Sequence, residues 1–227
     1  MGGVTTTSSF SGDRAQSMDE GGIEYHRTRL STWRGSENFD ESKQAWLDMF
    51  LPDKPAWVFA YGSLLWNPGF KYEESCRAIV YGYHRRFCIF SHVYRGTPRR
   101  PGLVFGLVRG GSCWGRIFRV PQALTRQVLG KIWDREMIYR VYQPCGLVAH
   151  VDSDRVLCHA FIANPKHEQF ADPMSLSRTA RVIAEAAGKS GSNFDYLDDM
   201  LKNLAELGLQ DVKLQKLHLA VRHIRGQ

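Results

Sequence analysis

Residues 57–69 of the 227-residue chain read WVFAYGSLLWNPG, and this stretch is the sharpest local feature of the sequence. Its apolar first part, ending at Tyr61, predicts a buried strand. Gly62 allows a bend or the close approach of a ligand, and Asn67-Pro68 closes a turn. Amide groups at the end of a strand can converge on an anion, as stabilisation of an oxyanion requires. Taken alone, the pattern is more often that of an ordinary turn.

Strands dominate the sequence around this stretch, and helices dominate the C-terminal part. We predict strands over 57–61, 79–90, 103–108, 114–120, 139–150 and 156–163. Arg109 to Ser112 is predicted to be a hairpin turn, and Pro121 to begin a helix that reaches about Trp133. Helical spacing recurs over 175–187, 193–207 and 211–224. Strands first and helices last predict one α+β domain.

The N-terminal segment differs in composition from the rest of the chain. Residues 1–37 are rich in Gly, Ser, Thr and charge and lack a periodic apolar face, so we predict a disordered or vector-derived extension. The domain then spans 38–227, opening with a helix capped by Asp40 that reaches about Phe50. Met1 to Thr6 fits the N-myristoylation pattern, but so short a pattern often arises by chance, and a flexible tail is favoured.

Composition excludes several classes of protein. The net charge is +7, from 30 Lys and Arg against 23 Asp and Glu, and the charges are scattered. We expect some attraction for small anions and, in the absence of a matching motif, no nucleic-acid partner. The sequence has no run of about 18 apolar residues, so we predict no membrane span.

The five cysteines are odd in number, widely spaced and without a CxxC pair. This pattern argues against a metal knuckle or redox motif and suits a reducing compartment, so we expect a cytoplasmic protein without a metal.

Several segments resemble, in order, motifs of the ChaC family, the glutathione-specific γ-glutamylcyclotransferases. The stretch 57–69 is similar to the family signature, and Trp133 to Met137 is similar to the segment that bears the catalytic glutamate. Other similar segments are 82–87, 91–98, 100–103, 115–120 and 188–193, with Tyr196 after the last. The resemblance extends over about residues 56–220 and leaves roughly the first 50 residues unexplained.

The resemblance implies the γ-glutamylcyclotransferase-like fold, a small mixed β-barrel with flanking helices. It also implies a lyase of glutathione catabolism that forms 5-oxoproline and cysteinylglycine. In this reaction the α-amine of the γ-glutamyl group attacks its own γ-carbonyl, so no cofactor or covalent intermediate is required. Orientation of this kind can supply about 7–11 kcal/mol in favourable cases. The expected partner is therefore the small-molecule substrate, glutathione.

By resemblance, Glu136 is the general acid/base, which takes a proton from the α-ammonium and returns one to the leaving nitrogen. Spacing alone favours a surface carboxylate paired with Arg135 or Arg140, and the resemblance outweighs that interpretation. Placement beside the apolar Ile132-Trp133 would desolvate Glu136 and raise its pKa, as the role requires. The nearest rival carboxylate, Asp134, is expected to face solvent or an arginine.

The resemblance also assigns a substrate-binding loop. Its expected residues are Val58, Phe59, Ala60, Tyr61, Gly62, Ser63 and Leu64, with backbone amides near Gly62–Leu64 as oxyanion donors. Tyr61 points its hydroxyl at the substrate or is a strand aromatic, and its place in the motif favours contact. Ser63 presents its backbone rather than acting as a nucleophile, because no motif places a His and an Asp to activate it.

Two further residues keep two interpretations each. Arg95 binds a substrate carboxylate in bidentate fashion or forms a structural salt bridge, with equal weight. Tyr196 donates a hydrogen bond to the α-carboxylate of the γ-glutamyl group or packs in the core.

Two alternative functions also stay open. One is the same chemistry on other γ-glutamyl peptides or amines. The other is a catalytically silent binding or regulatory protein of the same fold, against which the presence of Glu136 counts.

Overall fold

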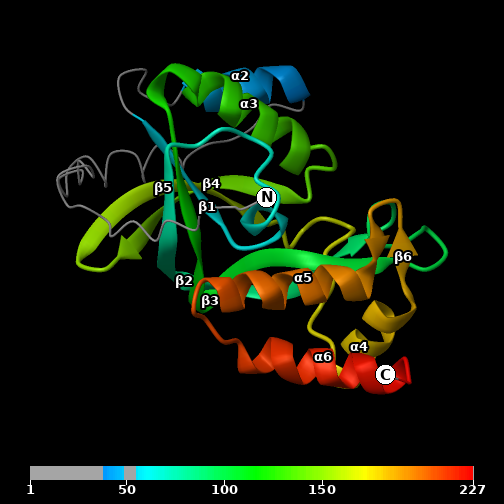
Figure 1. Cartoon of the computed structure of the whole chain (residues 1–227). Coiled ribbons are helices and arrows are strands. Elements are labelled where there is room, and N and C mark those ends of the chain that lie inside the picture. Colours follow the sequence, from blue (N-terminus) through cyan, green and yellow to red (C-terminus); the bar gives the residue numbers. More distant parts are fainter. Residues whose placement is uncertain (1–37, 49–54, 227) are drawn as a thin grey trace, which may run out of the picture.

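The computed structural model of the chain describes residues 38–48 and 55–226 (Figure 1). The predictions for residues 1–37, both the extension and the myristoylation pattern, lie outside the described residues.

Five strands form a closed barrel in the order β1-β3-β2-β4-β5 (Figure 1). They are β1 (Ala56–Ala60), β2 (Glu74–Ser91), β3 (Gly102–Val120), β4 (Tyr142–Val151) and β5 (Asp154–Ala163). Neighbours pair antiparallel except at the closing seam, where β1 runs parallel to β5 at Val58 and His159. The α+β class and the mixed barrel are therefore confirmed.

The predicted hairpin turn at Arg109 to Ser112 is wrong. β3 continues through this segment, and its pairing with β2 shifts between Tyr81–Ser112 and Tyr83–Arg109. Gly110 and Gly111, with φ of 97° and 71°, lie opposite the single residue Gly82, whose φ is 80°. Two residues against one is a β-bulge, which bends both strands and lets them contribute to the barrel along their length. The real turn of this hairpin lies at 92–101.

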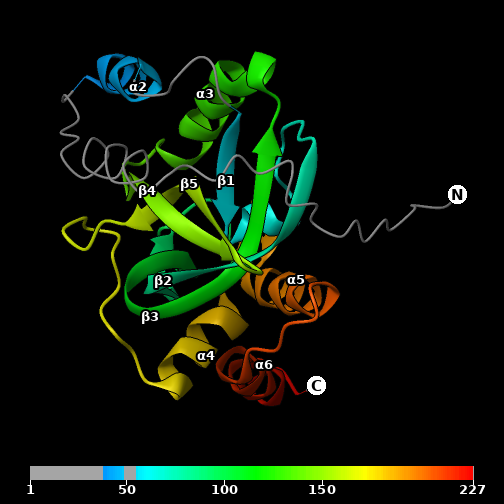
Figure 2. The same ribbon diagram turned by 90° about the vertical axis from the view of Figure 1, so that its left-hand side faces the viewer.

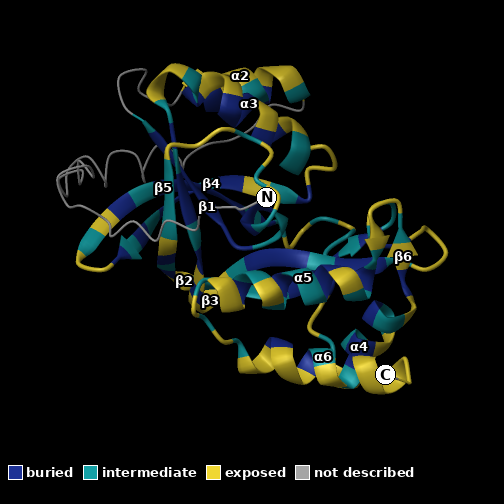
Figure 3. Ribbon diagram, in the orientation of Figure 1, coloured by how far each residue is buried: buried dark blue, intermediate teal, exposed yellow. Residues whose placement is uncertain are grey.

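Helices cover two opposite sides of the barrel (Figures 1 and 2). α2 (Phe39–Asp48) and α3 (Thr125–Glu136) lie on one side; α4 (Leu176–Glu185), α5 (Asn193–Glu206) and α6 (Val212–Ile224) lie on the other. Two 3₁₀ turns, η1 (Ser63–Leu65) and η2 (Gln122–Leu124), and a small hairpin of β6 (Ala187–Gly188) and β7 (Gly191–Ser192) complete the described part. Figure 3 shows buried residues concentrated in the strands and on the inward faces of the helices.

Two helix boundaries differ from the predictions. Asn38, not Asp40, caps α2, because the Asn38 side-chain oxygen accepts hydrogen bonds from the amides of Asp40 at 2.9 Å and Glu41 at 3.3 Å. Helix α3 starts after Pro121 and η2, and it extends past Trp133 to end at Glu136.

Helix α2 fastens α3 to the molecule. Trp46 of α2 and Trp133 of α3 are each 1% exposed, with ring centroids 5.2 Å apart. Lys43 Nζ lies 2.7 Å from both carboxylate oxygens of Asp134, so Asp134 faces outward to a lysine. The helix that ends at Glu136 is thus held by packing on one side and by an ion pair near its end.

Asn193 joins α5 to the barrel. Its buried side chain donates a hydrogen bond to the carbonyl of Leu103 at 2.7 Å and accepts one from the amide of Leu103 at 2.6 Å. The start of α5 is further fixed by a capping box between Ser192 and Asp195. Tyr196, one turn into α5, is therefore placed against β3.

We predict that Asn193→Ala destabilises the fold, because it leaves the amide and carbonyl of Leu103 buried without a partner. A loss of about 2–6 kcal/mol in the free energy of unfolding is expected, since each of the two groups costs about 1–3 kcal/mol. Denaturant unfolding followed by circular dichroism measures this loss. The matched control is Asn203→Ala on the same helix, whose side chain makes one hydrogen bond, to the carbonyl of Asp199. Equal stability of the two variants would contradict the anchoring role.

Candidate active site

Two adjoining cavities lie between the end of β1, the end of α3 and helix α5. The outer cavity has a volume of about 730 Å³ and the inner one about 30 Å³. Four residues line both: Ser63, Glu136, Tyr142 and Tyr196. These four residues therefore mark the junction of a narrow recess and a wider chamber.

The chain leaves β1 at Tyr61 and turns through Gly62 into η1. The amides of Leu65 and Asn67 donate to the carbonyls of Gly62 and Ser63, both at 2.9 Å, so the turn is a compact one. The first amides of a helical turn have no acceptor within it. The amides of Ser63 and Leu64 are the first of η1, and both residues line the inner cavity.

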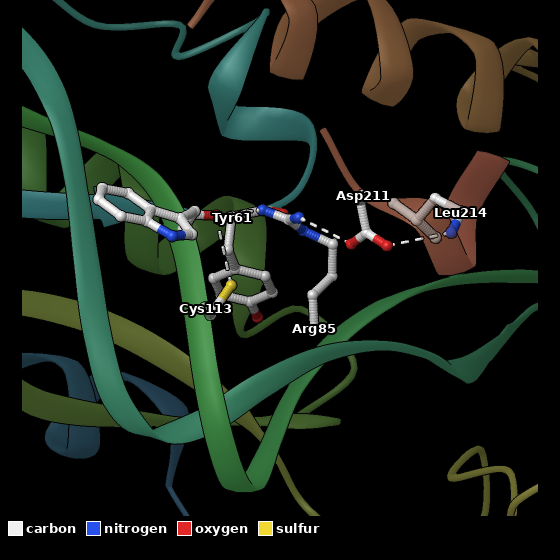
Figure 4. A network of polar contacts seen from close by, with 6 residues as sticks. Tyr61, Arg85, Cys113, Asp211 and Leu214 are labelled. Atoms are coloured by element: carbon white, nitrogen blue, oxygen red, sulfur yellow. Dashed lines mark hydrogen bonds and ion pairs between the residues drawn. The ribbon is translucent and has the colours of Figure 1, made fainter. Parts of the chain in front are cut away.

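Arg85 holds the entrance of this turn (Figure 4). Its side chain is 5% exposed, and it donates hydrogen bonds to the carbonyls of Tyr61 and Trp114, both at 2.6 Å. Its third nitrogen lies 3.9 Å from Asp211, which also caps α6 by accepting a hydrogen bond from the amide of Leu214. One guanidinium group thus joins the end of β1, the strand β3 and the start of α6.

Arg135 holds the far end of the same turn. It donates hydrogen bonds to the carbonyl of Asn67 at 2.5 Å and to the hydroxyl oxygen of Ser63 at 2.8 Å. Its Nε lies 3.2 Å from the Glu136 carboxylate.

Glu136, the last residue of α3, points into the junction of the two cavities with its side chain 16% exposed. Burial raises its pKa above the ordinary value, and the adjacent positive charge of Arg135 opposes that rise. A carboxylate in this setting exchanges protons closer to neutral pH than one in water. The burial that the catalytic interpretation requires is present, and so is the ion pair with Arg135 that the alternative of a surface carboxylate expected.

Three tyrosines surround Glu136. The hydroxyl of Tyr61 donates to the carbonyl of Phe161 at 2.5 Å, and that of Tyr142 donates to the carbonyl of Phe105 at 2.8 Å. The hydroxyl of Tyr196 accepts from the amide of Phe105 at 3.4 Å. Burial raises the pKa of all three phenols, so they are neutral hydrogen-bonding groups at physiological pH.

Residues 56–224 match the family of ChaC-like proteins, which is most of the chain. The chain belongs to the ChaC family. It is 36% identical over 178 residues to the glutathione-specific γ-glutamylcyclotransferase of Escherichia coli K12, covering 78% of this chain and 77% of the relative. It is 34% identical over 191 residues to the enzyme of that name from Schizosaccharomyces pombe, covering 75% and 94%.

The fold of this ChaC-like protein also has a solved counterpart. The crystal structure of a yeast γ-glutamylcyclotransferase specific to glutathione superimposes with a TM-score of 0.70 at 24% identity, covering 76% of this chain and 98% of the yeast protein. This likeness shows the shared barrel with its flanking helices.

Not every residue expected in the substrate loop of this ChaC-like protein reaches a cavity. Phe59, Tyr61, Gly62, Ser63 and Leu64 line the inner one. Val58 and Ala60 are fully buried in the core and line neither cavity. Successive side chains of a strand point to opposite faces, so only alternate side chains of β1 can face the inner cavity.

Arg95 and Tyr196 lie together. Arg95 lines the outer cavity, with its guanidinium carbon 5.2 Å from the centre of the Tyr196 ring. It donates a hydrogen bond to the carbonyl of Ser192 at 3.1 Å, and the structure gives it no carboxylate partner among the described residues. Of its two interpretations, the geometry favours a cation available to a substrate carboxylate. Tyr196 is buried, as the core interpretation expects, and it also lines both cavities, so its hydrogen bond to a substrate carboxylate stays a prediction.

Sequence reasoning missed Tyr142, Arg135 and Arg85 in the site of this ChaC-like protein. Tyr142 sits at the start of β4, where our predicted strand began three residues earlier, at Tyr139. The two arginines act through contacts with segments far along the chain, for which the sequence carries no local signal.

The described residues contain no helix long and apolar enough to cross a bilayer, and no group of three or more His, Cys, Asp or Glu placed to hold a metal ion.

We predict that Ser63→Ala keeps turnover within about tenfold of wild type, since the hydroxyl faces a guanidinium, which cannot accept its proton. Steady-state assays of γ-glutamyl peptide cleavage measure this. A nucleophilic serine would instead lose about a millionfold, as seen when a nucleophile that works with a base is removed. A loss of more than a thousandfold would restore the nucleophile interpretation.

Proposed function

We propose that this ChaC-like protein is a glutathione-specific γ-glutamylcyclotransferase, a lyase that converts glutathione to 5-oxoproline and cysteinylglycine. The observation that carries the proposal is the position of Glu136 at the junction of the two cavities, between the η1 turn and Tyr196. Both relatives compared above, from E. coli and fission yeast, bear the name of this activity.

The outer cavity suits the size of a tripeptide. Its volume of about 730 Å³ lies within the range of about 300–1,000 Å³ that small-molecule sites occupy. The reacting end of the γ-glutamyl group lies beside Glu136, and the cysteinylglycine part extends toward Tyr94, Arg95 and Gln169. Arg95 supplies a positive charge for a substrate carboxylate.

The proposed mechanism moves two protons through one carboxylate and needs no cofactor. The Glu136 carboxylate takes a proton from the α-ammonium, and the freed amine attacks the γ-carbonyl carbon to close a five-membered ring. The oxygen of the tetrahedral intermediate accepts hydrogen bonds from the amides of Ser63 and Leu64. Protonated Glu136 then returns its proton to the leaving nitrogen as the amide bond breaks. The attacking nitrogen, positively charged after the ring closes, gives up its second proton through the same carboxylate to the released amine, so the lactam nitrogen is neutral and cysteinylglycine leaves as an ammonium. The pKa of Glu136, raised by burial, suits a group that must both accept and give a proton.

We also propose a cytoplasmic setting without a nucleic-acid partner. All five cysteines are free thiols, and three of them, Cys88, Cys113 and Cys158, are buried. Burial raises the pKa of Cys88 to about 11, so its thiol stays protonated and unreactive. Free thiols in this number suit a reducing compartment.

The purified protein is expected to release 5-oxoproline and cysteinylglycine from reduced glutathione, detected by mass spectrometry. γ-Glutamylalanine lacks most of the group that fills the outer cavity, so it is expected to react at least about tenfold more slowly, because lost contacts typically change rates by that order. Faster reaction of γ-glutamylalanine would favour the broader cyclotransferase. Binding of glutathione without any product would favour the catalytically silent protein.

We predict that Glu136→Gln lowers kcat by about 10²–10⁴-fold, the usual contribution of a general acid/base, while glutathione binding and the thermal midpoint stay near those of wild type. Product assays, calorimetric titration and thermal unfolding measure the three quantities. The matched control is Asp48→Asn, whose exposed carboxylate pairs with Arg126 of α3 and lines neither cavity, and whose loss should leave kcat near that of wild type. Wild-type turnover by Glu136→Gln would refute the role.

A further inference from the structure

The guanidinium of Arg135 uses all three of its nitrogens at one place. Nη1 donates to the carbonyl of Asn67 at 2.5 Å, Nη2 donates to Ser63 Oγ at 2.8 Å, and Nε lies 3.2 Å from Glu136 Oε1. Two of these partners belong to the turn after β1, and the third is the proposed acid/base group. Arg135 therefore joins the turn and the carboxylate through polar contacts of one side chain.

We propose that Arg135 is a positioning residue of the reaction: it fixes the turn that faces the substrate and the carboxylate that moves the proton in one relative placement. This inference rests on the proposed role of Glu136. Arg135 itself need not touch the reacting atoms.

The contact with Glu136 requires the contacts with the turn. Adjacent residues on a helix do not face each other, so an Arg and a Glu at successive positions ordinarily point apart. Here Ser63 and Asn67 draw the guanidinium of Arg135 back over the end of α3, where it meets the carboxylate.

The loop is shaped around this side chain. Gly69 has a φ of +72°, and a Cβ atom added there would lie 3.6 Å from Arg135 Nη1. A side chain at this position would therefore meet the guanidinium at van der Waals distance, so the loop runs close beside Arg135. A planar fork of donors can serve three acceptors in this way, whereas a lysine offers one compact charge on a flexible stem.

Arg135 also sets the proton affinity of its neighbour. Its positive charge lowers the pKa of Glu136 against the rise that burial causes. Removal of that charge leaves burial unopposed, so the pKa of Glu136 rises further. Because the base must start deprotonated, the acidic limb of the rate profile then moves to higher pH.

The test compares Arg135→Gln, Arg135→Lys and Ser63→Ala with Arg126→Gln, a control that removes an exposed arginine of the same helix paired with Asp48. For each variant, kcat, KM and the pH dependence of kcat/KM on glutathione are measured. Backbone hydrogen exchange of residues 62–69 is followed by mass spectrometry.

For Arg135→Gln we expect the acidic limb to move up by about one pH unit, the lower end of the effect of an adjacent opposite charge. Exchange of residues 62–69 should become faster. Arg135→Lys should keep the acidic limb of kcat/KM near that of wild type. Like Arg135→Gln, it should show faster exchange of residues 62–69, and its KM should be raised. Ser63→Ala should raise KM without moving the limb, and Arg126→Gln should change none of these quantities.

Each way of failing is distinct. A wild-type limb and wild-type exchange in Arg135→Gln would overturn the positioning role. A merely structural role would lower the thermal midpoint in both Arg135 variants and leave the limb in place. If Arg135→Gln does not fold, Arg135→Lys decides, since wild-type exchange and KM in that variant would equally overturn the inference. If the wild-type protein does not cleave glutathione, the proposed function fails. The exchange measurement still tests whether Arg135 holds the turn at residues 62–69 in place.

Discussion

The site depends on a short turn held at both ends by buried or half-buried guanidinium groups. Arg85 binds the carbonyl of Tyr61 before the turn, and Arg135 binds the carbonyl of Asn67 after it. The amides between these two points must keep their direction if they are to serve a developing oxyanion, because such donors act only when they are already in place. A glycine-containing turn is intrinsically free to move, so the two tethers supply the rigidity that its own sequence lacks.

The tethers explain why the rest of the fold is needed. Arg85 comes from the long β2 strand and also reaches β3 and the cap of α6, so the turn is tied to the barrel and to the C-terminal helices together. Arg135 lies on α3, which Trp46 and Lys43 of α2 hold against the barrel. Arg85 is satisfied largely by carbonyl oxygens, and Arg135 by a carbonyl, a hydroxyl and a carboxylate oxygen, which offsets the cost of removing each charge from water.

Strand patterning and helical spacing predicted the α+β class and the C-terminal helices, because both are local signals, and the barrel followed from the resemblance to the ChaC family that the WVFAYGSLLWNPG motif carries. Sequence reasoning failed at Gly110-Gly111, where two glycines predict a turn and the structure has a bulge; only the opposing Gly82, about thirty residues away, distinguishes the two. It also failed to find Arg85, Arg135 and Tyr142 as parts of the site. Their roles arise from pairings between distant segments, such as Tyr142 with Phe105, which no single stretch encodes.

The same arrangement reconciles two demands on Glu136. A carboxylate that is too acidic holds no proton to give to the leaving nitrogen, and one that is too basic cannot start in the deprotonated form that the α-ammonium requires. Burial at the end of α3 moves the pKa of Glu136 upward, and the guanidinium at 3.2 Å moves it back. Since that guanidinium is also the tether of the turn, one side chain contacts both the turn that carries the proposed oxyanion donors and the proposed base, and it acts on the pKa of the latter. Geometry and acidity at this site are therefore coupled, and a change at Arg135 alters both at once.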